Sequence, residues 1–165
     1  MIKSLRIRNL ATIEDIELIL KEGFSILTGE TGAGKSIIID GIRLVTGEKG
    51  SPDMIRTGKK ETSVEVILPF QQNMPNLKNF LTESDNELFV QRKISEQQTG
   101  KGYINGTLVP IKKLKEIGGD LVDIYGQNDH VFLLNLDYQL NYLDDYANAS
   151  SLKKDVSRLA QELKK

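Results

Sequence analysis

Eight residues, from Gly29 to Ser36, have the types and spacing that bind phosphate. They fit the pattern G-x-x-x-x-G-K-[ST] at every fixed position. Glycines let backbone N–H groups turn inward around a phosphate, and the start of a helix adds partial positive charge. Lys35 would reach the β- and γ-phosphate oxygens, and the hydroxyl of Ser36 would bind Mg²⁺. The expected phosphate-binding residues are Gly29, Glu30, Thr31, Gly32, Ala33, Gly34, Lys35 and Ser36, with Lys35 also catalytic.

Hydrolysis needs a second polar group that holds Mg²⁺ and orients water, usually at the end of an apolar strand. Asp40 follows three isoleucines, but it falls on the helix expected directly after the loop. The segment 121–127 is a better candidate, because an apolar strand there would deliver Asp123 or Gln127 to the γ-phosphate. Its Asp-x-x-Gly-Gln pattern is similar to the metal-and-water segment of small GTPases. The sequence has no Asn-Lys-x-Asp motif for reading guanine, which disfavours a GTPase.

The elements that must position the loop follow from the spacing of apolar residues. Alternation in the first 28 residues indicates strands at 2–8 and 12–20, followed by a short strand at 24–28 that is buried on both faces. A helix over 36–45 follows the loop. The remaining pattern predicts strands at 62–68, 88–94 and 121–125, a hairpin at 102–109 around Asn105-Gly106, and helices at 110–117 and 136–146.

Length and composition narrow the class of protein. A chain of 165 residues with 39% hydrophobic and 27% charged residues is long enough for one globular domain. The absence of cysteine and the single histidine, His130, exclude disulfide frameworks and Cys- or His-rich metal sites. A formal net charge of −1 excludes a globally basic nucleic-acid binder. With no long apolar run and no signal-peptide pattern, we expect a cytoplasmic protein without a membrane partner.

The last residues carry a different pattern. Leu152, Val156, Leu159 and Leu163 are spaced by four, three and four residues, as in the seam of a coiled coil. An ordinary amphipathic terminal helix would show the same spacing over two heptads. We expect a lobe over residues 1–148 and the start of a coiled-coil arm over 149–165.

Five stretches taken in order resemble the SMC-like ABC ATPases, and within them the RecN family of bacterial DNA repair proteins. The resemblance covers about residues 1–148, nearly the whole chain. The loop alone indicates only the superfamily, whereas the ordered set is far more specific. The stretches are Ile7-Arg8-Asn9-Leu10, Leu27 to Ser36, Asp53 to Gly58, Gly102 to Gly106, and Tyr125-Gly126-Gln127.

The resemblance implies an α/β fold, the N-terminal lobe of an ABC/SMC-type ATPase head with a mixed sheet around the loop. It implies that Gln127 is the Q-loop glutamine, a catalytic residue that touches Mg²⁺ and the attacking water. It also places Arg56 near the nucleotide or the interface between heads, whereas an exposed loop arginine is the alternative. His130 fits a polar cap or surface residue better than a catalytic base.

The family further implies a DNA-stimulated ATPase of double-strand break repair, with ATP and Mg²⁺ as cofactors. Its partners would be the C-terminal half of its own head, a second copy in a head-to-head dimer, and DNA in the bacterial nucleoid. The Leu-Ser-Gly-Gly signature and the catalytic Asp-Glu pair do not occur in these residues. We therefore expect weak or no ATP hydrolysis by this chain and an exposed apolar edge.

Two other function classes remain open. A complete small P-loop NTPase or kinase would use Asp123 and Gln127, and rapid turnover by the chain alone would favour it. A non-catalytic binding module would keep its partner when Lys35 is replaced by alanine. The basic clusters at 112–115 and in the last 17 residues are more often solvated faces than DNA contacts.

Overall fold

A computed structural model describes residues 1–29, 34–69, 77, 80–81, 86–122, 124 and 136–163. The chain divides into two compact units, Met1–Asp123 and Ile124–Lys165, and each is described by itself. The sequence predicts a different boundary, between residues 148 and 149, where a coiled-coil arm would begin. That boundary stays a prediction. No helix in the described part of the chain is long and apolar enough to cross a membrane.

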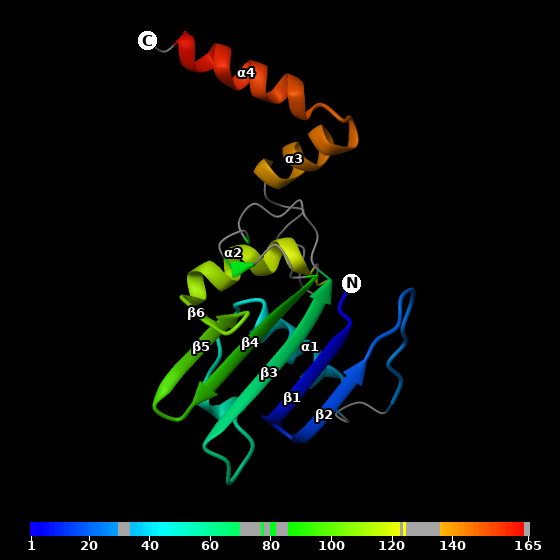
Figure 1. Cartoon of the computed structure of the whole chain (residues 1–165), viewed down its shortest axis with the longest axis vertical. Coiled ribbons are helices and arrows are strands. Elements are labelled where there is room, and N and C mark those ends of the chain that lie inside the picture. The colour runs from blue at the N-terminus through cyan, green and yellow to red at the C-terminus, as the bar shows by residue number, and fades with distance from the viewer. Residues whose placement is uncertain are drawn as a thin grey trace. The chain divides into compact units, whose positions relative to one another are not determined.

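The first unit is built on a six-stranded sheet in which all five pairings are antiparallel (Figure 1). The strand order is β2-β1-β3-β4-β5-β6. The strands are β1 (Ser4–Leu10), β2 (Ile13–Ile19), β3 (Glu61–Pro69), β4 (Glu87–Ser95), β5 (Gln98–Ile104) and β6 (Thr107–Val109). The strands β1 to β4 match those expected from the sequence, and β5 and β6 form the hairpin expected around Asn105-Gly106, although β5 begins earlier, at Gln98.

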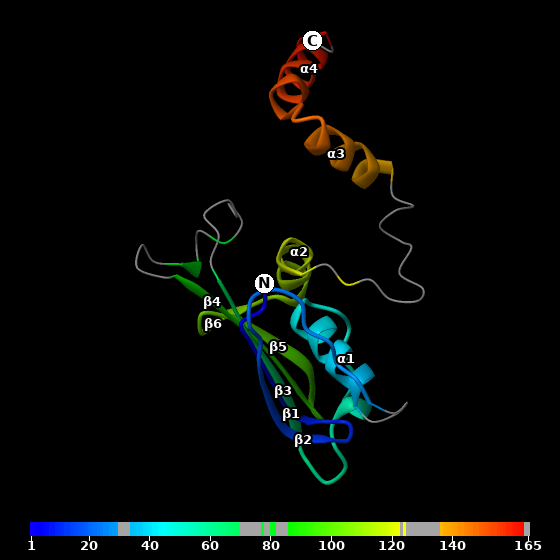
Figure 2. The same cartoon turned by 90° about the vertical axis from the view of Figure 1, so that its right-hand side faces the viewer.

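Two helices cover one face of this sheet, α1 (Lys35–Val45) and α2 (Ile111–Leu121) (Figure 2). Alternate residues of the central strands point into the core between helices and sheet, as the buried positions of β3 and β4 show. A short 3₁₀ helix, η1 (Pro52–Met54), lies between α1 and β3. The core residues include Leu5, Ile7, Leu44, Val64, Val66, Leu88, Val90, Ile104, Leu114 and Ile117.

The Asn105-Gly106 pair forms the turn between β5 and β6, as its sequence predicts. Both residues have positive φ, 45° at Asn105 and 79° at Gly106, which suits a two-residue hairpin. The Asn105 side chain also accepts a hydrogen bond from the Phe89 backbone N–H at 2.8 Å and donates one to the Phe80 carbonyl at 3.2 Å. The turn therefore anchors β4 and the segment before it.

The helix α2 is longer than expected. The sequence predicts a helix that ends at residue 117, directly before Gly118 and Gly119, but α2 continues to Leu121. A Cβ atom on Gly118 would lie 2.2 Å from the carbonyl oxygen of Thr46, so glycine is needed there for close packing against the end of α1. The strand predicted over 121–125 is consequently wrong at its start, because Leu121 is helical, and Val122 and Ile124 are in no strand. Asp123 and Tyr125 lie outside the described residues.

The strand predicted at 24–28 is also not formed. Phe24 and Ile26 have exposed fractions of 89% and 70%, where a strand buried on both faces was expected. A strand needs a neighbour for its backbone N–H and C=O groups. Within the described residues, no strand pairs with this segment.

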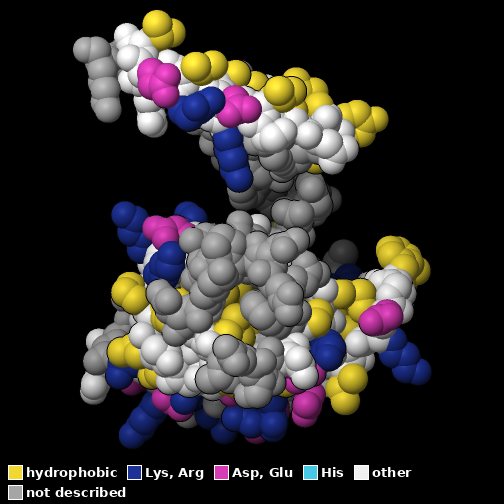
Figure 3. Space-filling view, turned by 45° about the horizontal axis from the view of Figure 1, so that its top comes forward, with side chains coloured by type: hydrophobic (Ala, Val, Ile, Leu, Met, Phe, Trp, Pro, Cys, Tyr) yellow, Lys and Arg dark blue, Asp and Glu magenta, His cyan; other side chains and the backbone are white. Residues whose placement is uncertain are grey.

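The second unit contains α3 (Leu136–Tyr146) and α4 (Ser150–Glu162), as the sequence predicts. Lys153 on α4 forms an ion pair of 3.2 Å with Asp144 on α3. Apolar side chains run along one edge of α4 beside its charged residues (Figure 3). These exposed side chains are the expected heptad residues Leu152, Val156, Leu159 and Leu163.

Candidate phosphate-binding site

The helix α1 starts at the phosphate-binding pattern. Gly34 is its N-cap residue, with φ of 101°, a left-handed conformation that glycine adopts without strain. Gly34 has no side chain with which to cap the helix, and the first turn of α1 has no acidic residue. Its first backbone N–H groups and the positive end of its dipole therefore suit an anion. Glu30, Thr31, Gly32 and Ala33 lie outside the described residues.

The side chain of Lys35 reaches back to the start of the phosphate-binding pattern. Its ammonium group donates a hydrogen bond to the carbonyl oxygen of Gly29, at the opposite end of the pattern. A Cβ atom on Gly29 would lie 3.7 Å from the Lys35 Nζ atom. A cation thus lies beside the N-terminus of α1, which fits the phosphates of a nucleotide. Ser36 follows in the first turn and is exposed, so its hydroxyl is accessible to a metal ion.

Arg56 is held against the turn between β1 and β2. Its guanidinium donates to the carbonyl oxygen of Thr12, and its backbone N–H donates to the Asn9 carbonyl at 2.9 Å. The Ala11 N–H donates to the carbonyl of Met54 at 2.8 Å, next to a β-bridge between Leu10 and Ile55. Arg56 is half-buried and lies in the loop before β3, and its role near the nucleotide or at the interface between heads stays a prediction.

The remaining sequence-predicted site residues lie elsewhere. Asp40 is on α1, as expected, and is not at the end of a strand. Gln127, Asp123 and His130 are outside the described residues, so their roles stay predictions.

Sequence reasoning missed a buried arginine on β4. Arg92 has an exposed fraction of 2% and lies on the core side of the sheet with Val90 and Ile94. Burial lowers the pKa of Arg92. The alternation of the strand predicted at 88–94 puts position 92 inside, so that signal was present in the sequence. Sequence reasoning also missed a polar pocket on the face of β3, β4 and β5 that points away from the helices. The register between the strands brings its residues together, and no pattern within one strand predicts that register.

The antiparallel sheet, the two helices on one face and the G-x-x-x-x-G-K-[ST] pattern at a helix start have the fold of the N-terminal lobe of SMC head domains. Residues 4–165 match the AAA domain family, and the chain belongs to that family. It is 38% identical over 153 residues to the DNA repair protein RecN of Bacillus subtilis, which confirms the RecN resemblance. That match covers 90% of this chain and 27% of the relative, so the chain spans about a quarter of that protein's length.

Solved structures confirm the fold. The Smc head domain of Pyrococcus furiosus, solved with an extended coiled coil and the C-terminal domain of ScpA, has a TM-score of 0.71 at 18% identity. The alignment covers 99% of this chain and 46% of that one. An SMC ATPase studied for ATP-driven dimerization and DNA-stimulated activation has a TM-score of 0.61 at 18% identity, covering 87% of this chain and 97% of that chain.

Proposed function

We propose that this chain is the ATP-binding N-terminal lobe of a RecN-like ATPase head that acts in bacterial DNA repair. The observation that carries the proposal is the Lys35 ammonium group at a helix N-terminus whose N-cap residue is glycine, within a complete phosphate-loop pattern. The RecN relatives and the AAA domain match support the same function.

In this proposal, the loop residues Gly29 to Ser36 wrap the phosphates of ATP with their backbone N–H groups. Lys35 exchanges its hydrogen bond to the Gly29 carbonyl for one to a phosphate oxygen. Ser36 and Gln127 hold Mg²⁺, which would neutralise charge on the β- and γ-phosphates. Gln127 also orients the attacking water, and Arg56 contributes from the β1–β2 turn to the nucleotide or to the interface between heads.

The rest of the head comes from the longer protein. A C-terminal half would supply the signature motif and the Asp-Glu pair, and residues 149–165 would begin the coiled-coil arm. Two heads would then enclose two ATP molecules, with ATP as the ligand that favours the closed dimer and hydrolysis releasing it. The neighbour described by ATP-driven dimerization and DNA-stimulated activation supports this cycle. The protein would act on DNA in the cytoplasm, at the nucleoid.

Measuring binding and hydrolysis separately tests the proposal. The chain should bind a fluorescent ATP analogue in the presence of Mg²⁺ and should hydrolyse ATP weakly or not at all. Lys35→Ala should weaken binding about 10- to 100-fold, and Lys49→Ala, which alters an exposed lysine outside the pattern, should leave it unchanged. Unchanged nucleotide affinity in Lys35→Ala contradicts the assigned site.

The hydrolysis measurement separates the lobe from a complete small NTPase. Adding the C-terminal half of the protein should raise turnover many-fold if this chain is one half of a head. Rapid turnover by the chain alone, abolished in Asp123→Ala and Gln127→Ala, would instead support the complete enzyme.

A further inference from the structure

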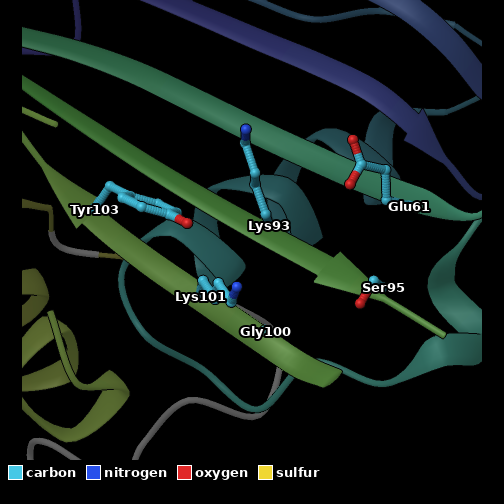
Figure 4. Close-up of a pocket in the computed structure, with 6 residues that line it drawn as sticks. All are labelled: Glu61, Lys93, Ser95, Gly100, Lys101 and Tyr103. Atoms are coloured by element: carbon cyan, nitrogen blue, oxygen red, sulfur yellow. The ribbon is translucent and has the colours of Figure 1, made fainter. Parts of the chain in front are cut away.

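The sheet face opposite α1 and α2 carries a polar pocket over β3, β4 and β5. The pocket has a volume of about 240 Å³. Figure 4 shows its side chains standing on the same face, with Lys93 between Glu61 and the Tyr103 ring. The lining residues are Glu61, Lys93, Ser95, Gly100, Lys101 and Tyr103.

Two lysines are placed directly opposite each other in this pocket. Lys93 on β4 pairs with Lys101 on β5 in the antiparallel register. Cβ atoms of directly opposite residues are about 4.5–5.5 Å apart, and like charges at that position destabilise a sheet. Among the described residues, no ion pair involves either lysine. An anion between the two ammonium groups would relieve their repulsion.

On the same face of the sheet, the two arginines of β1 lie close to carboxylates. Arg6 donates to both carboxylate oxygens of Asp15, at 3.2 and 2.9 Å. Arg8 lies 3.7 Å from Asp15 and 3.7 Å from Glu65. The cations of β1 are therefore paired with carboxylates, whereas within the described part of the chain no ion pair holds Lys93 or Lys101.

The backbone under the pocket is irregular at two points. The β4–β5 register shifts between Lys93 and Ser95, and such irregularities redirect side chains and often lie near functional sites. Gly100 has φ of 120°, and a Cβ there would lie 2.8 Å from the Cζ atom of Arg92. The buried Arg92 guanidinium thus lies directly behind Gly100, so a side chain at this position would collide with it.

The charge and shape of the pocket favour a phosphodiester. Two lysines and Glu61 give a formal charge of +1, which matches one phosphodiester and not a doubly charged phosphate. The hydroxyls of Ser95 and Tyr103 can donate hydrogen bonds to its oxygens. The Lys93 ammonium lies 5.9 Å from the centroid of the Tyr103 ring, so that cation occupies a face on which a base would stack. The pocket therefore suits the backbone of a nucleic acid and not its bases.

We propose that Lys93 and Lys101 bind the phosphodiester backbone of DNA on the open face of β4 and β5. This inference rests on the proposed function, which names DNA as the partner, and it adds the surface of the sheet that DNA contacts. Binding here is independent of base sequence and falls with added salt, because it releases counterions from DNA.

The test is fluorescence anisotropy with a labelled oligothymidine strand, measured over a series of salt concentrations. Lys93→Gln/Lys101→Gln should weaken binding about 5- to 30-fold at low salt. It should reduce the slope of log K against log salt by about 0.7 for each phosphate that the variant no longer neutralises. The control, Lys21→Gln/Lys154→Gln, removes the same charge at two exposed lysines outside the pocket and should bind within about twofold of the unaltered chain.

Each outcome decides one question. Equal weakening in both double variants would show general charge attraction and overturn the pocket. Unchanged binding in the pocket variant would also overturn it, while leaving DNA as the partner. If the unaltered chain binds no oligonucleotide, both the pocket and the DNA partner fail, whereas ATP binding through Lys35 is judged separately. Because all four lysines lie at the surface, unchanged thermal unfolding confirms that each variant is folded.

Discussion

The ammonium group of Lys35 donates a hydrogen bond to the carbonyl oxygen of Gly29, six residues earlier in the chain. The contact joins the two ends of the phosphate-loop pattern and places a cation beside the N-terminus of α1. A nucleotide phosphate would compete with this carbonyl oxygen for the cation, and a charged acceptor forms the stronger hydrogen bond. The contact therefore places the Lys35 ammonium group where a bound phosphate could replace the carbonyl oxygen of Gly29 as an acceptor.

This relationship separates the roles of Lys35 and Ser36. Lys35→Ala should weaken nucleotide binding about 10- to 100-fold with or without Mg²⁺, because it removes a charge-assisted hydrogen bond. Ser36→Ala should weaken only the Mg²⁺-dependent part. Isothermal titration calorimetry with ATP in magnesium and in EDTA distinguishes the two. A Ser36→Ala variant that loses the same affinity in both solutions would refute the role of its hydroxyl as a metal ligand.

Adjacent glycines in α2 should respond oppositely to alanine. Gly118→Ala forces a Cβ atom against the Thr46 carbonyl and should lower the free energy of unfolding by about 1–3 kcal/mol. Gly119→Ala meets no atom within 4 Å and should raise it by up to about 1 kcal/mol, because alanine favours helix. Urea denaturation of both variants measures the difference. Equal effects would mean that α2 does not approach α1 as closely as described.

The sequence predicted local structure well where the spacing of apolar residues or the residue types of a turn determine it. Alternation located β1 to β4, and the Asn105-Gly106 pair located the last hairpin. The phosphate-loop pattern located the start of α1, because its glycine, lysine and serine must occupy fixed places at a helix N-terminus.

Prediction failed where distant parts of the chain decide the outcome. The helix predicted to end at residue 117 continues through Gly118, and the close approach to Thr46 explains the glycine at that position. The segment 24–28 has the apolar composition of a buried strand, yet a strand also needs a partner, and composition says nothing about which residues supply one. Lys93 and Lys101 lie opposite each other because of the register between β4 and β5. Residue spacing within one strand does not determine that register.

The Arg6–Asp15 pair should appear in the acid titration of the protein. The hydrogen bonds from Arg6 hold the pKa of Asp15 below its ordinary value. The pair's contribution to stability is therefore present above the pKa of the unfolded chain, about 3.9, and is lost as pH falls through the lower folded pKa. NMR titration should give a midpoint for Asp15 below that value, and Arg6→Gln should raise it. Lys3→Gln, which removes the same charge elsewhere on the sheet, should leave the midpoint unchanged.

Exposed apolar side chains before the loop should make the chain associate with itself. Phe24 is 89% exposed and Ile26 is 70% exposed, in a segment without a strand partner among the described residues. Phe24→Ser/Ile26→Ser should shift the chain toward monomer in sedimentation velocity experiments, because it removes apolar surface and breaks a β-prone run. The melting temperature should change little, since neither side chain is buried. If the proportion of monomer does not change, another surface is responsible for self-association. The double variant Leu152→Ser/Leu159→Ser would then test the apolar edge of α4 as that surface.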